Sequence, residues 1–182
     1  LGAPTLHLDI DEGTAWGMVC NGWDRLIPVA EKAGVRIAIE AVYGMVCRDY
    51  YTLAELMRRY DSPHFGVNYD PSHMALHYNA VPWTIHQLKD RIFHCHVKDV
   101  AGVPGKVMGD TFLFPFLGEG RVDWPGFFRA MREIDYTGVL SVEFEAFDYF
   151  DTTLQQDLRR AAALFYRDYQ NLNRQYGSGR SN

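Results

Sequence analysis

The sequence predicts an α/β fold built as part of a TIM (β/α)8 barrel, and three observations support this prediction. Apolar segments rich in β-branched residues alternate with amphipathic helical segments five times, at roughly the 30-residue spacing of a βαβ step. Polar residues follow four of these apolar segments, and a barrel gathers all its strand ends on one face. The sequence lacks the G-x-G-x-x-G and Walker A phosphate turns that a doubly wound nucleotide-binding sheet would carry.

The N-terminal part predicts a short strand, a loop and a helix. Thr5–Leu8 is a short apolar run and is interpreted as a strand, whereas Asp9–Gly22 is rich in glycine and acidic residues and is interpreted as a loop. Asp24 then caps a helix that ends at Gly34. Pro28 is compatible with this helix because it falls near the predicted first turn.

The middle of the chain predicts three strands separated by two helices. The strands are Val35–Glu40, Phe65–Tyr69 and Ile92–Val97, which are apolar enough to be covered on both faces. The helices are Leu53–Tyr60 and Pro82–Lys89.

The C-terminal part predicts a long loop over Val100–Val122, a helix capped by Asp123 and a strand over Val139–Glu143. A last helix carries one apolar stripe, formed by Leu154, Leu158, Ala161, Ala162, Phe165, Tyr169 and Leu172. The resulting division is a single partial barrel domain over residues 1–176 and a flexible Gly/Ser-rich tail over residues 177–182.

A complete barrel of this kind needs about 250 residues, so five βα units cannot close. We expect about three further units to lie before Leu1 or to be supplied by another chain, either a second copy or a separate N-terminal half of the barrel.

Composition excludes several classes of partner. With 18 Lys and Arg against 23 Asp and Glu, the net charge of −5 argues against nucleic acid. No apolar run approaches the roughly 18 residues of a membrane span, and the first residues do not resemble a signal peptide. The cysteines are odd in number and lack C-x-x-C spacing, which is typical of reduced thiols in the cytoplasm: Cys20, Cys47 and Cys95.

Four polar residues stand at the carboxyl ends of predicted strands: Glu40, Asp70, His96 and Glu143. Three carboxylates in one cavity repel one another unless a cation compensates them. An oxygen-rich set with one imidazole suits a divalent metal. A single glutamate at a strand end is usually only solvated, so the metal hypothesis depends on all four residues occurring together.

Other side chains near these strand ends are interpreted as structural. His94 lies one layer deeper than His96 and is expected to be a hydrogen-bonded interior histidine. Phe112, Phe114 and Phe116 are expected to pack in the core, with a role in a lid as the alternative.

Four motifs resemble those of the sugar phosphate isomerase/epimerase family of xylose-isomerase-like TIM barrels. They are D-P-S-H at Asp70–His73, H-C-H-V-K-D at His94–Asp99, L-G-E-G-R-V-D-W at Leu117–Trp124 and Y-T-G-V-L-S-V-E at Tyr136–Glu143. The resemblance covers about residues 33–143 in family order.

The resemblance implies that Glu40, Asp70, His96 and Glu143 bind a divalent metal, with Mn²⁺ expected and Mg²⁺, Co²⁺ or Zn²⁺ as alternatives. It also implies that Glu40 and Glu143 are catalytic, and that His73 and Lys98 bind the carbohydrate substrate. Epimerases of the family often carry an arginine a few residues after the lysine, where this sequence reads A-G-V-P-G.

The implied function is a metal-dependent sugar, sugar phosphate or keto-polyol isomerase or epimerase that transfers protons through an enediolate. The same residues would also support a lyase or dehydratase acting on a keto-sugar or keto-inositol. Two alternatives of other classes are an abasic-site endonuclease relative and a non-catalytic barrel subunit.

Overall fold

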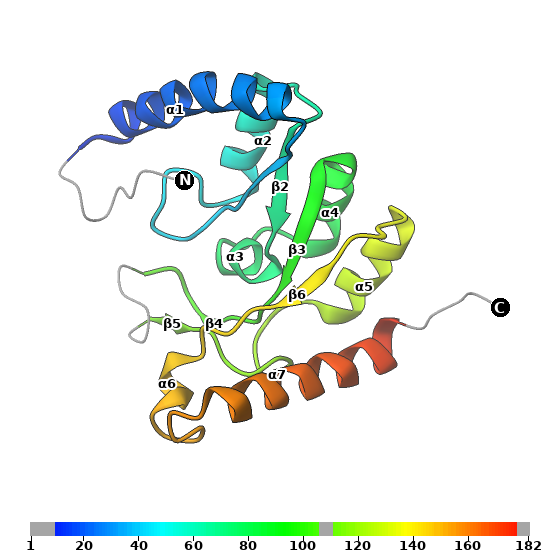
Figure 1. Cartoon of the computed structure of the whole chain (residues 1–182). Coiled ribbons are helices and arrows are strands. Elements are labelled where there is room, and N and C mark those ends of the chain that lie inside the picture. The colour runs from blue at the N-terminus through cyan, green and yellow to red at the C-terminus, as the bar shows by residue number, and fades with distance from the viewer. Residues whose placement is uncertain (1–9, 106–110, 178–182) are drawn as a thin grey trace.

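The computed structural model describes residues 10–105 and 111–177, whose central element is a sheet of four parallel strands (Figure 1). These are β1 (Ile37–Ile39), β2 (Phe65–Tyr69), β3 (Ile92–Val97) and β6 (Leu140–Val142), in the order β1-β2-β3-β6. The strand order follows the chain and never reverses. A doubly wound sheet reverses its order at a switch point, so this topology is that of part of a barrel.

Helices precede, connect and follow the strands of the sheet and bury apolar side chains in the core. The longer ones are α1 (Glu12–Ala33), α2 (Tyr50–Arg59), α4 (Val81–Leu88), α5 (Trp124–Glu133) and α7 (Leu158–Leu172). The short elements are α3 (Pro71–Leu76), η1 (Lys89–Arg91), α6 (Phe147–Phe150), η2 (Asn173–Gly177) and a two-stranded hairpin of β4 (Ala101–Gly102) and β5 (Phe112–Leu113). No helix in the described ranges is long and apolar enough to cross a membrane.

The predicted loop over Asp9–Gly22 is wrong, because most of it belongs to α1. The helix begins at Glu12, and the carboxylate of Asp11 caps it by accepting a hydrogen bond from the Thr14 N–H. The predicted end is confirmed, since Gly34 adopts the left-handed conformation with φ 65° and terminates the helix.

The glycines of this segment suggest a loop, although its apolar residues have helical spacing. Gly17 and Gly22 lie where an added Cβ would meet no atom within 4 Å, so they face open space. Each costs about 1 kcal/mol of helix propensity, which burial of apolar side chains offsets. The buried set has the helical period: Ala15, Val19, Trp23, Ile27 and Ala30. Pro28 consequently lies inside the helix rather than near its start.

Most other predicted elements are confirmed with small shifts. In the last helix the predicted apolar stripe is only partly right, because Leu154 precedes α7, and Leu158 and Ala162 are exposed. The strands Phe65–Tyr69 and Ile92–Val97 have the predicted bounds, and Asp123 caps α5 by accepting from the Gly126 N–H. Helix α2 begins three residues early because Asp49 and Thr52 form a capping box.

The two loops after β2 and β3 contain more structure than the sequence predicted. Asp70 ends its strand and at once caps α3, which the sequence analysis did not identify. The predicted loop Val100–Val122 contains the β4–β5 hairpin. The predicted strand Thr5–Leu8 lies outside the described residues, as does all of the predicted tail except its first residue.

Strand alternation divides the sheet into two faces. Phe65, Val67 and Tyr69 of β2 are fully buried, whereas Asn68 between them is only partly buried. In β3, His94 and His96 point the same way as Asn68, and His94 lies opposite Asn68 in the strand register. One face of the sheet therefore packs in the core, and the other presents polar side chains to the candidate site.

Candidate metal centre

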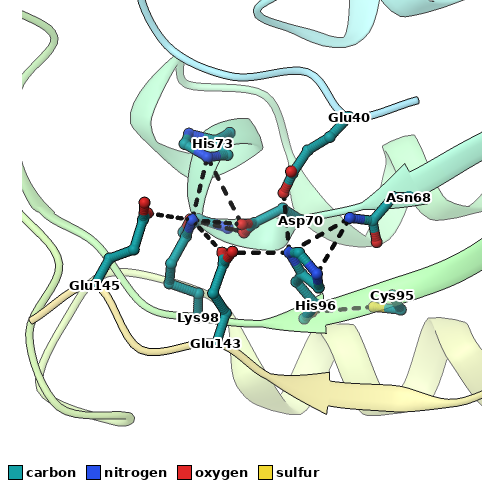
Figure 2. Close-up of polar contacts among 10 residues, drawn as sticks. Glu40, Asn68, Asp70, His73, Cys95, His96, Lys98, Glu143 and Glu145 are labelled. Atoms are coloured by element: carbon teal, nitrogen blue, oxygen red, sulfur yellow. Dashed lines mark hydrogen bonds and ion pairs between the residues drawn. The ribbon is translucent and has the colours of Figure 1, made fainter. Parts of the chain in front are cut away.

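Four side chains from four strand ends meet on the polar face of the sheet (Figure 2). Glu40 directly follows β1, Asp70 follows β2, His96 is the penultimate residue of β3 and Glu143 follows β6. One ligand atom from each lies within 4.8 Å of all the others. The structure therefore brings together all four residues that the sequence selected.

His96 lies at the centre of the group. Its Nδ1 is 3.0 Å from Glu40 Oε1 and 3.2 Å from Glu143 Oε2. Burial lowers the pKa of His96, but the hydrogen bonds to Glu143 and Glu40 outweigh that effect and raise the pKa to about 10. The two glutamates thus favour the protonated form of the His96 ring.

Asn68 and His94 are neighbours of the His96 ring, and His94 differs from its prediction. The Asn68 amide nitrogen lies 3.3 Å from Nε2 and is the polar partner of this ring nitrogen. His94 packs edge-on against His96, with ring centroids 5.5 Å apart. The His94 side chain makes no hydrogen bond within the described residues, so the predicted hydrogen bond is wrong; the ring faces the partly open side of the sheet.

Asp70 is buried, and its two oxygens have different partners. Oδ1 accepts hydrogen bonds from the backbone N–H and the hydroxyl of Ser72, both at 2.7 Å. Oδ2 lies 2.9 Å from Lys98 Nζ. Burial raises the pKa of Asp70, but the charge of Lys98 outweighs it and holds the pKa well below the usual value. Asp70 is therefore a permanent carboxylate.

Lys98 is the buried cation of the site, with 2% of its surface exposed. Its Nζ lies 2.9 Å from Asp70 Oδ2, 2.5 Å from Glu143 Oε2 and 2.6 Å from Glu145 Oε2. It also lies 4.6 Å from the centre of the Phe114 ring. Burial lowers the pKa of Lys98, but the carboxylates outweigh it and raise the pKa, so this ammonium stays charged.

His73, on α3, lies beside this lysine. Its Nε2 is 3.3 Å from Lys98 Nζ, and its ring packs edge-on against Phe114 and stacks near Tyr43. Burial lowers the pKa of His73 to about 4, so the imidazole is neutral at physiological pH. Its Nδ1 has no hydrogen-bond partner in the described part of the chain.

The predicted packing role of the phenylalanines is confirmed. Phe112 and Phe114 are buried and contact Tyr43, whereas Phe116 packs against Tyr149 and Phe165.

The two glutamates have opposite pKa shifts. Burial raises the pKa of Glu40, and the hydrogen bond from His96 only partly offsets this. Burial would also raise the pKa of Glu143, but hydrogen bonds and charge from His96 and Lys98 hold it below the usual range. Two carboxylates with separated pKa values can take different roles in proton transfer.

The donor set fits a divalent cation on its chemistry and its dimensions. Bonds of about 2.0–2.5 Å place opposite ligand atoms about 4–5 Å apart, which matches the observed limit of 4.8 Å. Three carboxylates and one imidazole are ligands that such cations accept. Glu40, Asp70, His96 and Glu143 would therefore hold the metal, and Asn68 would orient the imidazole.

Sequence reasoning gave no role to two residues that line this site. Glu145 reaches Lys98 from the loop after β6, and strand alternation with Glu143 was the signal that could have identified it. Tyr43 arrives from the loop after β1, where no sequence pattern marks it.

A cavity of about 680 Å³ runs along β1 beside the site and is bordered by Glu40, Asn68, Trp23 and Met45. Its size falls within the range of small-molecule sites, about 300–1,000 Å³. The metal cluster therefore adjoins open space.

Comparison with known proteins identifies the family to which this chain belongs. The family model of the xylose isomerase-like TIM barrel matches residues 2–168. The inosose isomerase of Bacillus subtilis is 27% identical over 143 residues, which cover 75% of this chain and 49% of that protein. The putative L-ribulose-5-phosphate 3-epimerase SgbU of Escherichia coli is 28% identical over 142 residues, which cover 78% of this chain and 49% of that protein.

Among solved structures, the IolI protein with a zinc atom aligns with a TM-score of 0.74 and 20% identity, covering 98% of this chain and 62% of that one. This likeness concerns the fold. The chain spans about half the length of the curated relatives it matches. Because the family model covers most of the sequence, the chain belongs to the xylose isomerase-like TIM barrel family.

Proposed function

We propose that this chain carries the catalytic site of a divalent-metal-dependent isomerase or epimerase that acts on a sugar, sugar phosphate or keto-polyol. The observation that carries the proposal is the convergence of Glu40, Asp70, His96 and Glu143 within 4.8 Å at the strand ends. The curated relatives named above, an inosose isomerase and a putative sugar phosphate epimerase, support this substrate class.

The two glutamates divide the proton transfer between them. A bound divalent cation supplies Lewis-acid polarisation of adjacent carbonyl and hydroxyl oxygens of the substrate. Glu143, held ionised by His96 and Lys98, suits the removal of the proton beside the carbonyl. Glu40, whose pKa is raised, suits the return of a proton. Return to the neighbouring carbon gives isomerisation, whereas return to the opposite face of the same carbon gives epimerisation.

His73 and Lys98 are proposed to bind substrate oxygens. The neutral imidazole and the ammonium lie 3.3 Å apart beside Asp70 and Glu143. The His73 Nδ1, which has no hydrogen-bond partner among the described residues, can donate to or accept from a substrate oxygen. The ammonium can donate to a substrate oxygen that takes the place of one of its present partners.

Manganese is the metal that we propose, because three carboxylates and one imidazole form a harder donor set than those of zinc sites rich in histidine and cysteine. Elemental analysis after incubation with equal concentrations of Mn²⁺, Mg²⁺, Co²⁺ and Zn²⁺ tests this choice. We also propose the cytoplasm as the location, because all three cysteines are free and buried.

The barrel is proposed to be completed by further strands, from the same polypeptide or from another chain. In the described residues, β1 and β6 are the two edges of the sheet and have no partner strand on their outer sides. Unpaired parallel edges expose backbone donors and acceptors that a closed barrel satisfies. The molecular mass in solution, measured by light scattering, tests whether a second copy supplies these strands.

Solvent hydrogen exchange tests the proposed chemistry directly. The metal-loaded protein is incubated in D₂O with an inosose or a ketohexose, and NMR follows deuterium at the carbons beside the carbonyl. Isomerase or epimerase chemistry predicts deuterium uptake together with a rearranged or inverted product. Formation of a dehydrated product would instead indicate a lyase or dehydratase. Absence of both deuterium uptake and product would refute the proposal.

A further inference from the structure

Of the three carboxylates that pair with Lys98, two also belong to the candidate metal centre. Asp70 and Glu143 belong to the group of four that can hold a cation, whereas Glu145 does not. Figure 2 shows the Lys98 ammonium between Glu145 on one side and the metal cluster on the other. Glu145 is thus the one carboxylate on this lysine whose charge is not committed to a metal.

The ammonium hydrogen-bonds to Glu143 Oε2 at 2.5 Å and to Glu145 Oε2 at 2.6 Å, and it lies 3.3 Å from His73 Nε2. Asp70 Oδ2 is an ion-pair partner at 2.9 Å and makes no hydrogen bond with the described residues. When Asp70 and Glu143 ligate a cation, the cation repels Lys98 and neutralises part of the negative charge that stabilises its ammonium group. A buried ammonium that loses its counter-ions is strongly destabilised. Lys98 is almost fully buried, and its other neighbours are the His73 ring at 3.3 Å and the Phe114 ring at 4.6 Å, neither of which carries a carboxylate.

We propose that Glu145 is a positioning residue that keeps Lys98 paired when Asp70 and Glu143 bind the metal. The inference rests on the proposed metal-dependent function. Glu145 does not ligate the metal or touch the reacting atoms; it acts through Lys98. Its side chain is 34% exposed, so solvent screens its direct effect on the metal more than it screens the contact with buried Lys98.

The contact has a simple structural origin. Glu143 and Glu145 are two residues apart after β6, and both carboxylates reach the Lys98 ammonium. Lys98 itself extends from just beyond the end of β3, the neighbouring strand. The same parallel pairing that brings Glu143 to the metal centre therefore brings Glu145 to the outer side of the lysine.

A double-mutant cycle on metal affinity tests the inference. Calorimetric titration with Mn²⁺ gives Kd for the unmodified chain, E145A, K98M and the double variant. We expect E145A to weaken Mn²⁺ binding about tenfold, as is common for outer-shell partners. In the K98M background we expect E145A to change Kd by less than about twofold. E119A is the control, since the exposed Glu119 side chain has one hydrogen-bond partner in the described part of the chain, the Tyr149 hydroxyl.

Three results would overturn the inference. They are an E145A Kd equal to that of the unmodified chain, a loss equal to that of E119A, or the same loss of affinity with and without Lys98. The last result would show that Glu145 acts directly through its charge. Failure of the unmodified chain to bind Mn²⁺ would instead refute the proposed function, so the two failures are distinguishable.

A second pair of variants covers the case in which K98M does not fold. Glutamine at position 145 keeps an oxygen that can accept from Lys98, whereas alanine does not. Positioning through Lys98 predicts that E145Q retains more Mn²⁺ affinity than E145A. Equal losses in the two variants would contradict the inference.

Discussion

Asp70 and Asp99 are both buried carboxylates that follow the neighbouring strands β2 and β3, but their hydrogen-bond partners differ. Asp99 has none of its surface exposed and accepts five hydrogen bonds, all from neutral N–H groups of the following segment. The donors are the backbone amides of Val100, Gly118, Gly120 and Val122 and the indole of Trp124.

Asp70 is satisfied by neutral groups on one oxygen only. Its Oδ1 accepts hydrogen bonds from Ser72, whereas its Oδ2 forms an ion pair with Lys98 in the candidate site. A carboxylate whose oxygens are all held by its own loop fixes the shape of that loop. One that turns an oxygen towards charged groups remains available to a cation. Asp99 thus stabilises the fold of the segment that follows it, whereas Asp70 is available to the candidate metal centre.

The largest expected effect comes from the functional side of this comparison. E143Q removes the carboxylate that His96 and Lys98 hold ionised, and we expect turnover to fall by about a thousandfold or more. The exchange assay in D₂O measures this loss. E133Q, on the exposed face of α5, should retain activity. An E143Q protein with undiminished exchange would remove Glu143 from the reaction.

D99N tests the structural side. The amide that replaces one carboxylate oxygen is a donor, so at least two of the five N–H groups lose their acceptor. We expect the free energy of unfolding to fall by about 3–5 kcal/mol, measured by urea denaturation. A loss below about 1 kcal/mol would mean that the loop does not depend on Asp99.

D70N provides the matched variant. Its remaining oxygen still accepts from Ser72, and Lys98 keeps Glu143 and Glu145, so we expect a smaller loss of about 1–2 kcal/mol. Mn²⁺ affinity should fall by at least about a hundredfold, because a ligand charge is removed. For the comparison to hold, D70N must impair metal binding more than D99N and stability less, and a reversed order would break it.

The smallest expected effect concerns an exposed carboxylate. Glu55 pairs with Arg58 at 2.6 Å on the surface of α2. Exposed pairs of this kind contribute little because solvent screens them. E55Q should therefore leave both the melting temperature and the Mn²⁺ Kd unchanged within error, and a clear shift in either would show that short ion pairs matter here regardless of burial.

The sequence predicted the metal cluster because each ligand lies at the end of an apolar strand, and the parallel order brings such ends together. The strands carrying Asn68 and His96 were predicted with the observed bounds, since their apolar runs stop at polar residues. The start of α1 was missed because its glycines mask a helical period whose value depends on burial.

The role of Asp99 could not be predicted, because its hydrogen-bond donors lie up to 25 residues away, the most distant being the indole of Trp124 at the start of α5. Lys98 and Asp99 are adjacent just beyond the end of β3, yet Lys98 reaches the cluster and Asp99 accepts hydrogen bonds from the following segment. Only the folded chain shows which acid is satisfied by neutral groups and which is not.

The most direct test of the account is anomalous diffraction at the manganese edge from crystals of the Mn²⁺-loaded protein. The account predicts one peak within about 2.0–2.5 Å of Glu40, Asp70, His96 and Glu143 together. A metal ion bound elsewhere, or no peak between these four side chains, would contradict it.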